Sequence, residues 1–188
     1  MDFFIADTHF GHKKIVEYTG RPSNYLGLIM AGWRKTVKPE DTVYHLGDVS
    51  FLNKEKTIKI LKLLPGKKLL LRGNHDHYHG KQWFLTVGFE DIIASTFVYK
   101  EGLNGVIVLT HAPLSMEKQK ELTGLYPKKL IINIHGHIHE KNPDDFYEKL
   151  ANVVFCNISV EQINMTPITL VEIFSQLYAQ KKLTFLTP

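Results

Sequence analysis

Five short apolar runs along the chain each stop at a polar residue with a side chain that can bind a metal ion. Runs rich in Val, Ile and Leu and bounded by glycine are typical of buried strands. They occur as FFIA (3–6), TVYHL (42–46), KLLLR (68–72), GVIVLT (105–110) and LIINIH (130–135). Less regular apolar stretches predict further strands at 92–99, 151–158 and 183–186.

Helical spacing of apolar positions separates several of these runs. The clearest cases are 24–36 and 54–64, and a third helix is expected at about 169–180. Strands that alternate with helices predict an α/β fold in layers, with a second sheet packed on the first. No repeat, linker or shift in composition divides the chain, so we expect residues 1–188 to form a single domain.

The side chains that follow the apolar runs are good metal ligands. In open α/β sheets, ligands bind at the carboxyl ends of the strands, so these side chains are expected to lie together. The candidate ligands are Asp7, His9, Asp48, Asn74, His111, His137 and His139. Sites that mix imidazole with oxygen donors favour Mn, Fe, Co, Ni or Zn over Mg and Ca. Two such ions beside two carboxylates attract phosphate and activate water, which favours hydrolysis over metal storage.

The same residues carry a family resemblance. DTH (7–9), GD (47–48), GNHD (73–76), THAP around His111 and GHIH (136–139) occur in the order found in calcineurin-like metallophosphoesterases. As a set, these motifs resemble the compact bacterial and phage-type members of that superfamily. The resemblance implies a four-layer fold, a two-sheet β-sandwich flanked by helices.

The resemblance also implies a role for each motif residue. One metal ion would bind Asp7, His9 and His139, and the other Asn74, His111 and His137, with Asp48 bridging the two. His75 would be a catalytic residue that contacts the phosphoryl oxygens or protonates the leaving group. Asp76 would assist it by supporting the loop or by orienting His75. Mn²⁺ is the favoured ion, and Fe, Zn, Ni and Co suit the same ligands.

One difference from the protein phosphatase motif narrows the expected substrate class. The protein Ser/Thr phosphatase branch resembles GDxxDRG after the second motif, whereas this chain reads GDVSFLN, with Phe51 and Leu52 in place of the acid and the arginine. We therefore expect a phosphodiesterase that acts on a small nucleotide-like or cyclic phosphodiester through a metal-bridging hydroxide. A phosphomonoesterase and a non-catalytic interaction scaffold on the same fold are the alternatives.

Several other side chains have two readings. His12 and Arg21 follow the first motif and are expected either to bind substrate or to lie at a solvated surface. Phe10, Trp33 and Trp83 suit the core better than stacking on a base. The segment 140–149 follows a predicted ligand directly and should overhang the site.

Composition adds weaker limits. The 23 Lys and Arg exceed the 19 Asp and Glu by 4, which suits an anionic substrate but does not support binding to long nucleic acid. The single cysteine, Cys156, excludes an internal disulfide. No run reaches the roughly 18–20 apolar residues of a membrane span, and MDFFIAD does not resemble a signal peptide. We expect a cytoplasmic protein with a small phosphoester substrate; the oligomeric state is left open.

Overall fold

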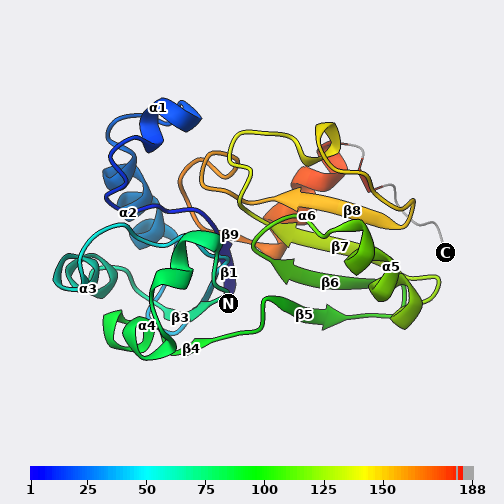
Figure 1. Cartoon of the computed structure of the whole chain (residues 1–188), viewed down its shortest axis with the longest axis horizontal. Helices are drawn as coiled ribbons and strands as arrows, with labels where there is room; N and C mark the ends of the chain where they lie inside the picture. Colours follow the sequence, from blue (N-terminus) through cyan, green and yellow to red (C-terminus); the bar gives the residue numbers. More distant parts are fainter. Residues whose placement is uncertain (181, 184–188) are drawn as a thin grey trace.

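Two β-sheets lie side by side in the computed structural model, which describes residues 1–180 and 182–183 (Figure 1). The first sheet has the order β4-β3-β2-β1-β9 and the second the order β5-β6-β7-β8. The strands of the first are β1 (Asp2–Ile5), β2 (Thr42–His45), β3 (Lys67–Leu70), β4 (Asp91–Ile92) and β9 (Ile168–Thr169). Those of the second are β5 (Thr96–Glu101), β6 (Gly105–Thr110), β7 (Leu130–His135) and β8 (Val153–Asn157).

The direction of the strands brings together the carboxyl ends after which the predicted ligands lie. Strands β1 to β4 are parallel, as are β6 to β8, while β9 and β5 pair antiparallel at one edge of their sheets. A parallel bridge between Ala6 and Ser159 joins the end of β1 to the end of β8. The carboxyl ends of strands from both sheets therefore meet at one place.

Helices cover the outer faces. They are α1 (Ile15–Thr19), α2 (Tyr25–Thr36), α3 (Lys54–Lys62), α4 (Lys81–Val87), α5 (Met116–Leu125) and α6 (Leu170–Ala179), with 3-10 turns η1 (Asn74–Tyr78) and η2 (Pro143–Asp145). In Figure 1, α1 to α4, blue to green, lie on one side of the first sheet and the second sheet lies on the other. This arrangement confirms the predicted α/β fold of two sheets flanked by helices.

Local sequence explains where two of the predicted helices begin. The side chain of Asn53 accepts a hydrogen bond from the backbone of Lys56 at the start of α3. Thr169 and Glu172 form a reciprocal capping box at the start of α6. The helices expected at 24–36, 54–64 and 169–180 are confirmed, whereas α1, α4 and α5 are additions.

Side chains of β6 point alternately to the two faces of the second sheet, and each face packs in a different apolar cluster. Ile107 and Leu109 belong to the main core, which also contains residues of β1 and α6. Val106 and Val108 point to the opposite face, where Leu122 of α5 packs in a separate apolar cluster. The second sheet is thus buried on both faces, as its continuous apolar runs predict.

Two strand predictions differ from the structure. The run 92–99 is two strands, β4 and β5, in different sheets, because the chain crosses between the sheets after Ile93. Ser95 and Thr96 interrupt the apolar residues of 92–99 at this crossing, but a break of two small polar residues is too short to mark it. Of the strand predicted at 183–186, Leu183 lies in a bend and the rest is outside the described residues. Within the described part of the chain, no helix has the length and apolar character that a bilayer crossing requires.

Candidate metal centre

The predicted ligands lie at the carboxyl ends of five strands, and an unusual backbone turns most of them toward one another. Non-glycine residues rarely adopt a positive φ, and each instance costs about 1–3 kcal/mol. Five of the seven predicted ligands do so: Asp7 (59°), His9 (43°), Asp48 (58°), His137 (73°) and His139 (53°). Strain concentrated on candidate ligands is typical of a functional site.

Glycines of three motifs allow the loops to pack closely around the carboxylates. A Cβ atom at Gly73 would lie 2.1 Å from Asp48 Oδ1, and one at Gly136 would lie 2.3 Å from Asp7 Oδ2. At Gly47, where φ is +97°, a Cβ would lie 2.4 Å from the Gly73 nitrogen. No residue larger than glycine therefore fits before Asp48, Asn74 and His137.

A first group of ligands consists of Asp7, His9 and His139, with one ligand atom from each within 4.8 Å of the others. Asp7 is fully buried; its Oδ2 accepts hydrogen bonds from the His137 backbone and from Ser159 Oγ, both at 2.8 Å. Its Oδ1 and both ring nitrogens of His9 are buried without a hydrogen-bond partner. Buried polar atoms are almost always paired, so these atoms fit a bound cation.

A second group consists of Asn74, His111 and His137. The Oδ1 atom of Asn74 lies 2.9 Å from His111 Nε2 and 3.0 Å from His137 Nδ1, and these two nitrogens are 3.2 Å apart. The other nitrogen of His111, Nδ1, donates to the carbonyl of Leu46 at 2.7 Å, which leaves Nε2 as the ligand atom.

Asp48 lies between the two groups. Its Oδ2 is 3.6 Å from His9 Nε2 and 3.5 Å from His111 Nε2, which suits the bridging role that the resemblance implies. Asp7 is also shared, because Asp7, Asp48 and His111 form a further group with ligand distances within 4.8 Å. Two carboxylates so close together are stabilised by a cation between them or by a proton on one of them.

The pKa shifts of the candidate ligands come from burial and from the charges of the neighbouring ligands. Burial raises the pKa of Asp7, and the nearby charge of Asp48 raises it further. Burial lowers the pKa of His9 to about 2, against the opposing effect of Asp48, so His9 is neutral and able to bind a metal ion. Burial alone would raise the pKa of Asp48, but the hydrogen bond and charge of His111 outweigh it and lower the pKa. The two groups of candidate ligands fit divalent metal ions.

His75 is placed differently from the ligands. Its side chain is 43% exposed, and its Nε2 lies 4.0 Å from Asp48 Oδ2. The ring also packs 5.1 Å from the ring of Phe51. His75 therefore lies at the mouth of the site, where it can reach a group bound at the metals.

Asp76 does not share this position. It is buried, and its carboxylate accepts three backbone N–H groups, from Asp48 (2.7 Å), Gly73 (2.8 Å) and Val49 (3.1 Å). These bonds tie the GD loop to the GNHD loop. Of the two roles expected for Asp76, the geometry matches loop support, and the described contacts give it no direct catalytic part.

Arg21 also requires a correction. Its side chain is fully buried rather than solvated, and it forms an ion pair with Glu161. Its guanidinium also donates to the carbonyls of Asp7 (3.2 Å) and Thr8 (3.4 Å). Because protein covers the whole side chain, Arg21 supports the DTH turn instead of contacting substrate.

Glu161 is the main residue that the sequence reasoning missed. Its Oε1 lies 3.2 Å from His139 Nδ1, which leaves His139 Nε2 for a metal ion. Ser159, the hydrogen-bond donor to Asp7, was missed as well. Both follow β8, so extending the strand-end rule to that strand would have found them.

A cavity of about 680 Å³ opens over the ligands. Four predicted site histidines, His9, His75, His137 and His139, line it together with His12, Ile15 and Tyr18. Glu140, Lys141, Phe146 and Tyr147 line it as well, so segment 140–149 borders the site. His12 borders this cavity, and its contact with substrate stays a prediction.

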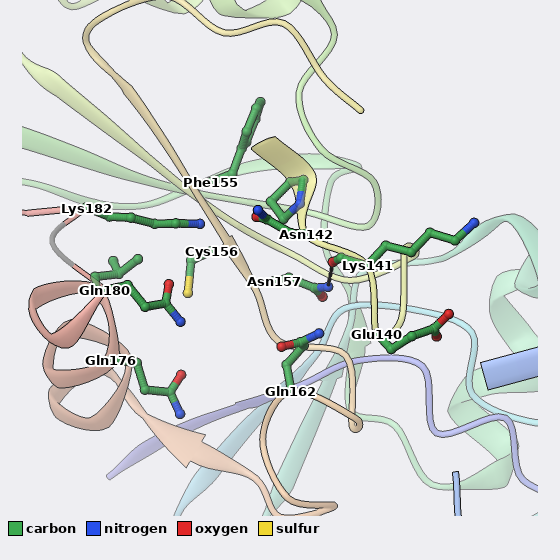
Figure 2. Close-up of a pocket in the computed structure, with 12 residues that line it drawn as sticks. Glu140, Lys141, Asn142, Phe155, Cys156, Asn157, Gln162, Gln176, Gln180 and Lys182 are labelled. Carbon is green, nitrogen blue, oxygen red and sulfur yellow. Dashed lines mark hydrogen bonds between the residues drawn. The ribbon is translucent and has the colours of Figure 1, made fainter. Parts of the chain in front are cut away.

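A second cavity, of about 440 Å³, is lined by Glu140, Lys141, Asn157 and Gln162 among others (Figure 2). Among the described residues that line it, none is a predicted ligand. In Figure 2, Gln176 of α6 and Gln180, just after that helix, lie across the space from Asn157 and Gln162. Asn157 Nδ2 and Gln162 Nε2 donate to the carbonyl of His139, at 2.7 and 3.1 Å. The wall between the cavities thus holds the His139 turn in place.

Comparison with known proteins agrees with this geometry. A model of the calcineurin-like phosphoesterase family matches residues 3–141. An uncharacterized protein of Methanocaldococcus jannaschii is 32% identical over 175 residues, covering 89% of this chain and 86% of its own. The gene 66 protein of Mycobacterium phage D29 is 28% identical over 159 residues, covering 74% and 78%. The crystal structure of a protein of unknown function from Aquifex aeolicus superposes with a TM-score of 0.71 at 29% identity, covering 94% and 98%.

Proposed function

Because this chain belongs to the calcineurin-like phosphoesterase family, we propose that it is a phosphodiesterase for a small nucleotide-like or cyclic phosphodiester. Family membership and the ligand groups support the broader statement that it is a metal-dependent phosphoesterase. The preference for a diester, the use of Mn²⁺ and the identity of the substrate are our proposals.

The small number of cationic side chains around the cavity is our reason for proposing a diester substrate. Lys141 is the single Lys or Arg among the described residues that line it, and Arg21 is buried against Glu161. Phe51 packs beside His75, at the motif position where the resemblance places an acid in the protein phosphatases. A phosphodiester carries one negative charge and a second organic group, whereas a monoester carries nearly two charges. A cavity with few cations and several apolar side chains suits the diester.

The chain's own residues divide the work of such a reaction. Metal ions held by the two ligand groups would polarise the phosphoryl oxygens and lower the pKa of water. Asp48, with His9 and His111 on either side, would hold those ions together. His75, whose Nε2 lies 4.0 Å from Asp48 Oδ2, would donate a proton to the leaving oxygen.

The test compares two chromogenic substrates on the Mn²⁺-loaded protein. We expect bis-p-nitrophenyl phosphate to be hydrolysed with a higher kcat/KM than p-nitrophenyl phosphate. Asp48→Asn, which removes the shared carboxylate, serves as the control for turnover by a contaminating enzyme. A large preference for the monoester would make the protein a phosphomonoesterase and overturn the proposal.

A further inference from the structure

A continuous row of rings runs along the metal cavity: Tyr18, His12 and His75 line it, and Phe51 packs between His12 and His75. Tyr18 lies 5.9 Å from His12, His12 lies 4.4 Å from Phe51, and Phe51 lies 5.1 Å from His75, measured between ring centroids. These residues come from α1, from the loops after β1 and β2, and from η1. We call these four residues the ring wall.

Two residues of the ring wall are more exposed to solvent than aromatic residues of a hydrophobic core. The exposed fraction is 63% for Tyr18 and 45% for Phe51. Phe146, which also lines the cavity, is 63% exposed, and Lys141 Nζ lies 5.5 Å from its ring centroid. Exposed aromatic side chains gathered at one cavity mark a binding site.

The aromatic residues considered from the sequence do not serve this purpose. Phe10 and Trp33 are fully buried in the main core, and Trp83 stacks on His79 at 3.9 Å. The exposed rings around the cavity are therefore a separate set. Their position beside His75 places them next to any phosphate bound at the ligand groups.

We propose that the ring wall binds a planar aromatic group attached to the substrate phosphate, with Phe51 as the main stacking residue. This inference rests on the proposed function, because it places the phosphate at the metal ligands. A nucleobase and a simple aryl ester share the required chemistry: a flat apolar face a short distance from a phosphate. The cavity of about 680 Å³ is in the size range of small-molecule sites.

The experiment measures binding without turnover. Three phosphonates with uncleavable P–C bonds are titrated calorimetrically into the Mn²⁺-loaded protein: methylphosphonate, phenylphosphonate and the 5′-methylenephosphonate analogue of thymidine monophosphate. We expect Phe51→Ala to weaken binding of the aromatic ligands by about 5- to 100-fold and to leave methylphosphonate unchanged. The two aromatic ligands distinguish an aryl ester from a nucleobase.

Three controls separate stacking from a purely structural role for Phe51, which also packs against His9. Phe51→Tyr keeps a ring and should keep the binding. Leu103→Ala removes an exposed apolar side chain outside the cavity and should change none of the three affinities. The metal content of every variant is measured, and it should stay at two ions per chain.

Equal weakening of all three phosphonates, or no weakening of any, would overturn the inference. Its failure is distinguishable from that of the proposed function. If the phosphonate pattern holds but bis-p-nitrophenyl phosphate is not hydrolysed, the phosphodiesterase fails and the aromatic site stands. If the diester is hydrolysed but the phosphonate pattern is absent, the phosphodiesterase stands and the aromatic site fails.

Discussion

Replacing Gly136 with alanine tests whether close packing around Asp7 controls the metal site. A Cβ atom there would lie 2.3 Å from Asp7 Oδ2 and 2.5 Å from the Cβ of Ala6. Contacts below 3.0 Å are not tolerated, so either the carboxylate or the glycine turn must move by about 0.7 Å (3.0 − 2.3). Asp7 has little room to move, because its Oδ2 is held by Ser159 and by the backbone of His137.

Two magnitudes follow from that displacement. Overpacking of this kind costs about 1–3 kcal/mol, which for a chain of this length lowers Tm by about 2–12 °C. Metal–ligand distances tolerate errors of about 0.2 Å, so a shift of about 0.7 Å should weaken metal binding by at least roughly 10-fold.

The assay combines thermal unfolding, with and without Mn²⁺, and metal content after equilibrium dialysis. Gly124→Ala in α5 is the matched control, because a Cβ there would meet nothing within 4 Å. It should raise stability by roughly 0.5–1 kcal/mol and leave metal content unchanged. If Gly136→Ala kept two ions and the same Tm, the close approach would not control the site.

Three further predictions concern His75, Glu161 and His45. His75→Asn should reduce kcat by roughly 10²–10⁴ with two ions still bound; loss of metal would instead make His75 a ligand. Glu161→Gln should weaken metal binding by about 10–100-fold in calorimetry because it frees His139 to turn, whereas Glu117→Gln, at an exposed position of α5 outside both cavities, should have no effect. Burial lowers the pKa of His45 to about 3, from about 6.5 when unfolded, so the unfolded chain binds more protons and stability falls as pH drops from 6.5 toward 3. His45→Gln should flatten that loss in urea unfolding at pH 7 and 5, and an equal loss in both proteins would contradict it.

That the candidate ligands lie close together was predictable, because it follows from one local rule applied along the chain. Each apolar run ends at a polar residue, and the carboxyl ends of parallel strands meet. The rule says nothing about long-range partners. The burial of Arg21 depends on Glu161, which lies 140 residues away in the sequence. The positive φ of Asp7 is likewise invisible in the sequence, because it depends on packing against both sheets.

The strands were predictable to within one or two residues where an apolar run has polar or glycine boundaries, as for β6 and β7. The prediction failed at 92–99, where the polar boundary is weak and the chain changes sheets. Pattern alone identifies which residues are buried but not which neighbour covers them.

The positive φ angles at five candidate ligands have a consequence for the protein's history. A residue held in that region costs free energy that Gly or Asn would largely save, and Asp7 adds the cost of a buried carboxylate. Selection for folding alone would therefore replace these residues one after another. A lineage that stopped using the metals would gain stability with each loss, and restoring a ligand would become steadily harder. Keeping all five residues therefore costs folding stability, which is the expected cost of a site built to bind metal ions.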